Sequence, residues 1–169
     1  MSEVAWIDAE TKAVQDPGDH KAELRLWLRL LTCTKLIENE VRRRLRHDYD
    51  FTLSRFDLLA QLDKAKDGMV LGEVSKRLMV SPGNVTSLVE RLIHSGHISR
   101  APSPLDGRVQ FIKLTEKGRR EFNRMARDHG DWIADLFRGI SKSESESLMK
   151  SLAILKQSVI AGVDGRNHG

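Results

Sequence analysis

Residues 81–114 constrain the fold more than any other stretch of this chain. The run Ser81-Pro82-Gly83-Asn84-Val85 predicts a helix start, because its serine can act as the N-cap and a proline at the first helical position loses no hydrogen bond. Apolar residues then recur at helical spacing up to Gly96, a natural helix stop. Two extended runs follow, 97–101 and 108–114, and the prolines and Asp-Gly pair between them predict a β-hairpin.

Helical patterns precede this stretch. Residues 21–47 contain no proline or glycine, and the first half of this predicted helix is apolar around more than one face. Such a helix must be covered on several sides, which favours a partner subunit in a chain of 169 residues. Thr52 precedes a second helical pattern, and a short third helix is expected to end at Met79-Val80.

Two further helices are predicted after the hairpin. Thr115 can cap a helix that runs from residue 116 to about residue 138. Ser141 and Glu144 form a capping box for a last helix that reaches about residue 160. The fold is therefore expected to be mainly α, with a small β-hairpin.

The charge is distributed unevenly along the chain. The formal net charge is +4, but residues 1–19 hold five acidic residues and one lysine, a net of −4, so the remainder carries 4 + 4 = +8. A basic folded body favours a polyanionic partner such as nucleic acid.

The cellular compartment is predicted from what the sequence contains at its start and from its single cysteine. The N-terminal stretch has acidic residues where a signal peptide would have lysine or arginine, and no apolar run approaches the ~18 residues that a membrane span needs. Cys33 alone cannot form an intramolecular disulfide or a zinc-finger site. We expect a cytoplasmic protein without membrane association.

Two short helices joined by a tight turn and followed by a hairpin are the order of a winged helix-turn-helix, whose second helix enters the major groove of DNA. Asn84 and Arg91 can reach base edges, and Arg108 on the hairpin can enter a narrow minor groove. The same side chains could instead form the solvated face of a helical bundle, but the capped helix, the hairpin and the basic body together favour DNA binding. The predicted DNA-binding residues are Ser81, Pro82, Gly83, Asn84, Thr86, Ser87, Arg91, Asp106 and Arg108.

This sequence resembles the MarR-type transcriptional regulators. The resemblance rests on residues 81–92, on Gly96-His97-Ile98-Ser99-Arg100, on the Asp-x-Arg signature at 106–108 and on Leu-Thr-x-x-Gly at 114–118. It implies a homodimer that presents two winged helices to a pseudo-palindromic operator, with Arg108 as the wing arginine and Asp106 as the acid that orients nearby arginines. Val70 and Gly107 depart from the family pattern, since a hydroxyl cap and an arginine are frequent at these positions.

The resemblance also implies a division of the chain. The first and last helices, with part of the fifth, would form a dimerisation frame around the winged helix-turn-helix. The expected parts are a flexible acidic arm (1–20), the N-terminal frame helix (21–50), the DNA-binding domain (51–115), the C-terminal frame helices (116–162) and a disordered tail (163–169).

A ligand site is expected between the frame and the DNA-binding domain, as in many regulators of this type. Four arginines within residues 42–46 repel one another unless an anion neutralises them, and the cluster can be a solvated patch, a patch that faces DNA phosphates or a site for an anionic ligand. Residues 30–38 and 51–58 resemble a subgroup linked to aromatic acid catabolism, so an aromatic acyl-CoA thioester or its parent acid is the hypothetical inducer. The candidate ligand-binding residues are Trp27, Leu31, Arg42, Arg44, Arg46, Phe56 and Trp132, with Arg43 and Phe137 nearby in sequence.

Two other functions compete with ligand-responsive repression. Cys33 could act as a peroxide-sensing thiol, although no second cysteine can resolve an oxidised one. The winged helix could also be a protein-interaction module whose basic face meets an acidic partner. Scattered histidines predict no metal site, and the absence of a nucleophile elbow or a phosphate-binding glycine loop predicts no enzyme activity and no cofactor.

Overall fold

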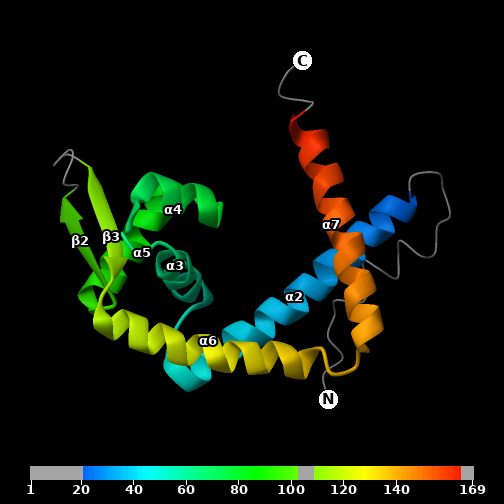
Figure 1. The fold of residues 1–169 in the computed structure, drawn as a ribbon, viewed down its shortest axis with the longest axis horizontal. Coiled ribbons are helices and arrows are strands. Elements are labelled where there is room, and N and C mark those ends of the chain that lie inside the picture. Colours follow the sequence, from blue (N-terminus) through cyan, green and yellow to red (C-terminus); the bar gives the residue numbers. More distant parts are fainter. Residues whose placement is uncertain (1–20, 103–108, 165–169) are drawn as a thin grey trace. The chain divides into compact units, whose positions relative to one another are not determined.

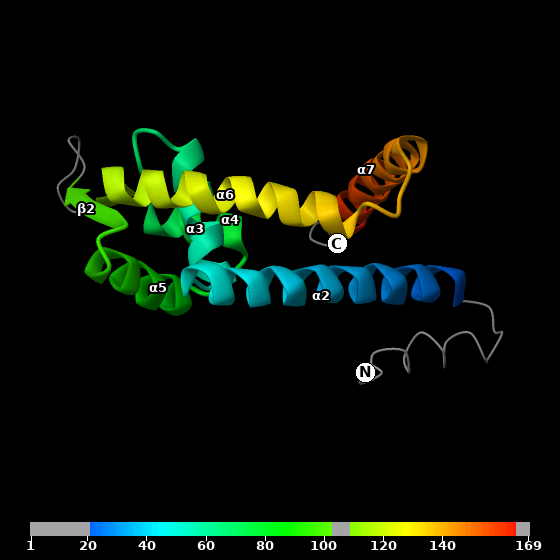
Figure 2. The same ribbon diagram turned by 90° about the horizontal axis from the view of Figure 1, so that it is seen from below.

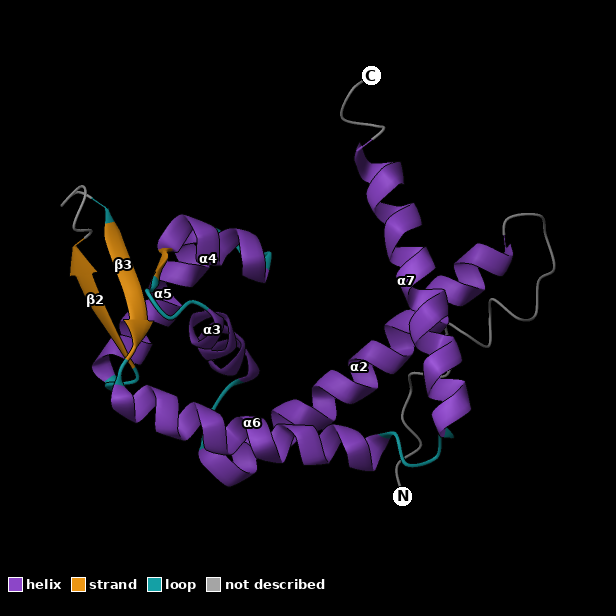
Figure 3. Cartoon of the chain, viewed as in Figure 1, coloured by secondary structure: helices purple, strands orange, loops and turns teal. Residues whose placement is uncertain are grey.

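The computed structural model describes residues 21–102 and 109–164, which form six helices and a small sheet (Figures 1 and 3). The chain divides into two compact units, Met1–Gly130 and Asp131–Gly169, and the boundary falls inside helix α6 (Glu116–Leu136). The expected N-terminal arm, the tip of the hairpin at 103–108 and the last five residues of the expected tail lie outside the described residues. The mainly helical fold with a small β wing is confirmed.

The first unit begins with the long helix α2 (Lys21–Tyr49), which ends two residues after the predicted end. Helix α3 (Leu53–Lys64) follows Thr52, as expected, and Thr52 is its N-cap, because the backbone N–H of Arg55 donates to Thr52 Oγ1 at 3.3 Å. Helix α4 (Leu71–Leu78) follows Val70, which occupies the N-cap position but makes no capping hydrogen bond with its side chain. Figures 1 and 2 both show α3, α4 and α5 (Pro82–His94) gathered beside the sheet.

The sheet has three antiparallel strands in the order β1-β3-β2. Strands β2 (Ile98–Pro102) and β3 (Gln110–Leu114) form the predicted hairpin, with Ile98 opposite Leu114. Strand β1 (Met69–Val70), which pairs with β3, was not predicted. Two residues between two helices carry no alternating pattern, so only the partner strand identifies them as part of a sheet.

The core of this unit lies between the sheet and the helix-turn-helix. The inward side chains of α3, α4 and α5 occur at helical spacing, and those of β2 and β3 alternate. Each such side chain contributes roughly 1.5–3 kcal/mol to stability by burial. The fully buried side chains include Leu58, Leu59, Leu62, Val74, Val85, Val89, Leu92 and Ile112. The wing and the recognition helix are therefore held on one common core.

The start of α6 is fastened to the base of the wing. Thr115 Oγ1 accepts a hydrogen bond from the backbone N–H of Gly118 at 3.0 Å, which confirms the predicted cap, and donates to the carbonyl oxygen of Gly96 at 2.7 Å. His97 is only 5% exposed, and its ring nitrogens lie 2.7 Å from Ser95 Oγ and 2.7 Å from Glu121 Oε2. This junction joins the recognition helix, the wing and α6 through one short segment.

The second unit holds the end of α6 and helix α7 (Lys142–Asp164). The predicted capping box is confirmed: Glu144 N–H donates to Ser141 Oγ at 3.2 Å, and Glu144 Oε2 accepts from the backbone N–H of Ser141 at 2.8 Å. The hydrogen bond from the Ser141 hydroxyl to Glu144 Oε2, at 2.6 Å, and the one from the Ser141 backbone N–H lower the pKa of the Glu144 carboxyl. Large apolar side chains of this unit are exposed, namely Leu136, Phe137, Ile140, Leu148, Met149, Leu152, Ile154, Val159, Ile160 and Val163.

Among the helices of the described ranges, none combines the length and the apolar character needed to cross a membrane.

Met79 occupies a left-handed backbone conformation at the end of α4, with φ 53° and ψ 38°. A residue with a Cβ loses roughly 1–2 kcal/mol there relative to the right-handed region, and the Met79 side chain, 92% exposed, has few contacts to lose. We expect Met79→Gly to raise the free energy of unfolding by about 0.5–1 kcal/mol in urea denaturation. Met79→Ala removes the same side chain but keeps the Cβ, so it should give no gain; an equal gain would contradict the strain argument.

Candidate nucleic-acid interface

Helix α5 separates an apolar side from a polar side. Val85, Val89 and Leu92 are buried, whereas the remaining outward positions are small, polar or charged. The predicted N-cap is confirmed in position, but the Ser81 side chain makes no capping hydrogen bond. The first-turn N–H groups are therefore not occupied by that hydroxyl, and such groups favour an anion such as a phosphate.

The structure gathers seven of the predicted DNA-binding residues on the exposed side of α5 and its entry turn. They are Ser81, Pro82, Gly83, Asn84, Thr86, Ser87 and Arg91. Thr86 has a further role within the helix, because its hydroxyl donates to the carbonyl oxygen of Pro82 at 3.0 Å. Asp106 and Arg108 lie outside the described residues.

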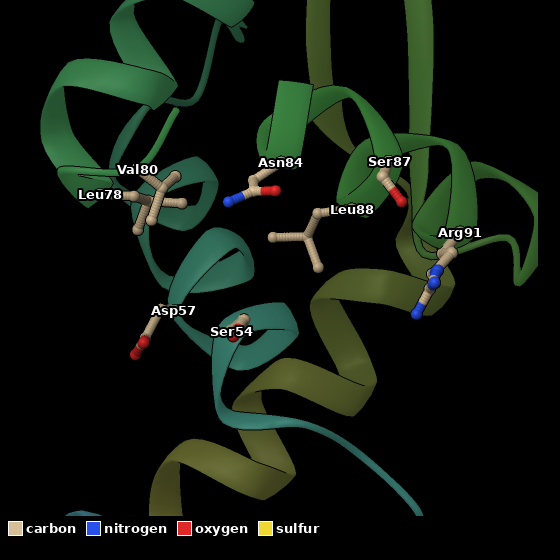
Figure 4. A pocket seen from close by; sticks show the side chains of 8 residues that line it. All are labelled: Ser54, Asp57, Leu78, Val80, Asn84, Ser87, Leu88 and Arg91. Atoms are coloured by element: carbon tan, nitrogen blue, oxygen red, sulfur yellow. The ribbon is translucent and has the colours of Figure 1, made fainter. Parts of the chain in front are cut away.

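A groove of about 320 Å³ lies between α5, α3 and the turn that joins α4 to α5 (Figure 4). Leu88 lies on the side of α5 that faces α3, with Asn84 one turn before it and Arg91 about one turn after it. Within the described residues Arg91 makes no ion pair, so its guanidinium is available to an external partner. The lining residues are Ser54, Asp57, Leu78, Val80, Asn84, Ser87, Leu88 and Arg91.

Asp57 gives this groove a negative charge opposite the positive charge of Arg91. Burial raises the pKa of the Asp57 carboxyl, and the Glu38 carboxylate raises it further, whereas Arg42 lowers it. The groove thus carries charges of both signs next to the side chains that were predicted to meet DNA.

Glu90, which was not among the predicted DNA-binding residues, lies on the exposed side of α5. Its Oε1 accepts a hydrogen bond from Arg100 Nη2 of strand β2 at 2.6 Å. In the sequence, Glu90 is only an acidic residue among polar and basic ones. This pattern does not indicate that Arg100, ten residues later, is its partner.

A second groove, of about 600 Å³, lies where α2 meets the start of α3, and three of its lining residues are arginines. Arg42 and Arg46 were both predicted to bind a ligand. Arg42 has only a long contact, 3.3 Å, to Glu38, and within the described ranges Arg46 makes no ion pair. The lining residues are Asn39, Arg42, Arg43, Arg46, Phe51, Thr52, Leu53 and Ser54.

Arg44 and Arg43 are engaged by Glu40. Arg44 Nε donates to Glu40 Oε1 at 2.6 Å, and Arg43 donates to both oxygens of the same carboxylate at 2.7 and 2.8 Å. These hydrogen bonds lower the pKa of Glu40 to about 2, so the carboxylate stays ionised at neutral pH. Arg46, which makes no ion pair within the described residues, and Arg42, which makes one long hydrogen bond to Glu38, are therefore the members of the arginine cluster with the most donors available to an anion.

The aromatic residues that were predicted to line a ligand site are not brought together in either groove. Trp27 is 56% exposed on α2, and Phe56 is buried in the core with its ring centroid 5.5 Å from that of Phe122. Phe56 faces inward because its position on α3 belongs to the apolar stripe of Leu59. Trp132 is buried in the second unit, and Leu31 is half-buried on α2.

Cys33 is exposed on α2. Within residues 21–102 and 109–164, no three histidine, cysteine, aspartate or glutamate side chains are arranged to hold a metal ion.

The helix-turn-helix of α4 and α5, followed by the β2–β3 hairpin to which β1 adds a third strand, defines a winged-helix protein. Residues 49–109 match the model of the MarR family. A MarR-family regulator from Silicibacter pomeroyi has a similar fold, with a TM-score of 0.73, 29% identity and coverage of 85% of this chain and 99% of that one. FabT of Streptococcus pneumoniae, solved in complex with DNA, has a TM-score of 0.70 and 27% identity over 81% of this chain and 96% of that one. The chain is therefore similar to MarR-family winged-helix regulators, in sequence over residues 49–109 and in fold over most of its length.

Curated relatives give the same class. The transcriptional activatory protein BadR of Rhodopseudomonas palustris is 30% identical over 111 residues, 63% of each chain. The transcriptional repressor IacR of Pseudomonas putida is 26% identical over 112 residues, 66% of each chain. The chain thus aligns with less than two thirds of the length of either relative. These proteins are regulators and not enzymes, which agrees with the expected absence of catalytic activity.

Proposed function

We propose that this chain binds duplex DNA as a homodimer and regulates transcription in the cytoplasm. The observation that carries the proposal is the exposed polar side of α5, where Asn84, Ser87 and Arg91 follow a helix start that favours phosphate. The similarity to FabT, a protein solved with DNA, supports the same conclusion. Residues 51–115 would read DNA, with Asp106 and Arg108 at the tip of the wing.

We propose the dimerisation frame because large apolar side chains of α2 and α7 are exposed to solvent in the single chain. On α2 these are Leu24, Leu26, Trp27 and Leu36, and α7 carries a longer set that includes Leu148 and Leu152. Exposed apolar area of this extent indicates an interface. A second copy would cover residues of 21–50 and 116–162 and would hold two recognition helices about one DNA turn, ~34 Å, apart.

Binding to DNA at graded salt tests this function. Genomic fragments are selected with the purified protein, and their affinity is measured by fluorescence anisotropy while sedimentation velocity reports the oligomeric state. We expect a dimer whose log affinity falls with log salt by about 0.9 per phosphate contacted. A salt-independent interaction, or a strictly monomeric protein, would favour the protein-interaction module instead.

We further propose repression that a small anionic aromatic ligand relieves, such as an aromatic acyl-CoA thioester of a degradation pathway. The support is the resemblance of residues 30–38 and 51–58 to that subgroup, together with the available guanidinium groups of Arg42 and Arg46 in the 600 Å³ groove. The relatives include a named activator and a named repressor, so a reporter assay must establish the direction of regulation. Loss of peroxide response in Cys33→Ser would favour the thiol alternative.

Removing the guanidinium groups of Arg42 and Arg46 should weaken ligand binding. Against 4-hydroxycinnamoyl-CoA, we expect the double variant Arg42→Ala/Arg46→Ala to bind about tenfold more weakly in calorimetry, since each exposed ion pair contributes about 0.2–1 kcal/mol and tenfold corresponds to about 1.4 kcal/mol. Arg44→Ala is the matched control, because Glu40 already engages Arg44. If the wild-type protein gives no heat with either this thioester or its free acid, the ligand proposal is wrong while DNA binding stands.

A further inference from the structure

Glu90 places a negative charge on the side of α5 that is proposed to meet DNA. It is exposed and lies beside Arg91. Duplex DNA carries one negative charge per ~1.7 Å of helix axis, so an unpaired carboxylate on this surface would oppose binding. Arg100 of the same chain pairs with this carboxylate and donates a hydrogen bond to it at 2.6 Å.

Arg100 belongs to strand β2 and reaches α5 from the sheet. It lies directly opposite Ile112 of β3, so the two side chains share one face of the sheet, the face that also carries Ile98. Ile98 and Ile112 are buried against the helices, and β2 is in contact with α5. The Glu90–Arg100 pair therefore connects the recognition helix to the wing at the edge of their common core.

We propose that Arg100 is a positioning residue for DNA binding, which neutralises Glu90 and holds β2 against α5 so that helix and wing approach the duplex as one unit. This inference rests on the proposed function, since it has a meaning only if α5 meets DNA. The pair is partly exposed, and exposed ion pairs contribute little to folding stability. Its effect is therefore expected in the affinity for DNA and not in the melting temperature.

A double-mutant cycle tests the proposal. Wild type, Arg100→Gln, Glu90→Gln and the double variant are compared on a duplex of roughly 30 base pairs, about three helical turns, that the wild-type protein has enriched from a random pool. We expect Arg100→Gln to bind about tenfold more weakly, because it leaves Glu90 facing the phosphates without a partner. Glu90→Gln should stay within about threefold of wild type, and the double variant should recover to the level of Glu90→Gln.

The recovery separates charge neutralisation from a merely structural role or from a direct contact of Arg100 with DNA. The proposal is wrong if Arg100→Gln binds like wild type, or if the double variant binds as weakly as Arg100→Gln. Arg119→Gln is the matched control: it breaks another pair between two elements, with Asp63 at 2.9 Å, away from α5, and should leave affinity unchanged. If the wild-type protein enriches no duplex at all, the proposed function fails and this inference fails with it.

Discussion

Replacing Gly118 with alanine is expected to destabilise the protein by about 3 kcal/mol or more, as forced overpacking does. A Cβ at this position would lie 1.9 Å from the carbonyl oxygen of His97 and 2.8 Å from its carbonyl carbon. Backbone atoms cannot rotate away as a side chain can, and Thr115 holds the same turn of α6 to the same segment. The start of α6 must therefore move away from the base of the wing.

Thermal denaturation measures this effect, with a matched glycine as control. For a chain of this length, 3 kcal/mol corresponds to a fall in melting temperature of roughly 6–12 °C. Gly130 lies in the same helix with nothing within 4 Å of an added Cβ. Gly130→Ala should therefore stabilise the protein by about 0.5–1 kcal/mol. Equal melting temperatures for the two variants would show that the close approach at Gly118 does not exist in solution.

Reversing the charge of Arg91 should reduce affinity for the selected duplex by about a hundredfold or more. A specific arginine contact contributes roughly 1–3 kcal/mol, and a glutamate in its place repels the phosphates as well. A dimer contains two copies of Arg91, so the loss of binding energy occurs at both half-sites. Arg91 is exposed at the groove beside Asn84 and Ser87 and makes no ion pair within the described residues, so Arg91→Glu should leave the fold intact.

Anisotropy titrations at two salt concentrations check this result. Arg138→Glu makes the same change of charge at an exposed position that belongs neither to α5 nor to its groove, and should leave affinity within about twofold. If both variants lose affinity equally, general charge and not the surface of α5 determines binding. If Arg91→Glu binds like wild type, α5 is not the recognition helix.

Several local features of this fold were predictable from the sequence because each depends on neighbouring residues. The caps at Thr115 and Ser141 are hydrogen bonds over three residues, and the structure confirms both of them. The apolar side of α5 follows from the spacing of Val85, Val89 and Leu92. The same spacing identified the polar side, so the exposed candidates for DNA contact were also predictable.

Contacts between distant segments were not predictable in this way. Phe56 was expected at a ligand site and lies in the core, because an aromatic residue at helical spacing fits both positions equally well. The four arginines within residues 42–46 looked equivalent, but Glu40 engages Arg43 and Arg44, whereas within the described residues Arg46 makes no ion pair. The partner of an arginine depends on which side of the helix it occupies and on what packs there.

By itself the sequence determined the order of the helices and of the β2–β3 hairpin, the caps at Thr115 and Ser141 and the exposed side of α5, since periodicity and capping act within a few residues of the chain. Only the tertiary structure decided that β1 joins the wing, that Arg100 neutralises Glu90 and that Gly118 must lack a side chain beside His97. These three facts depend on close approach between segments far apart in sequence. The positions of such segments are set by packing of the common core, and no local pattern records them.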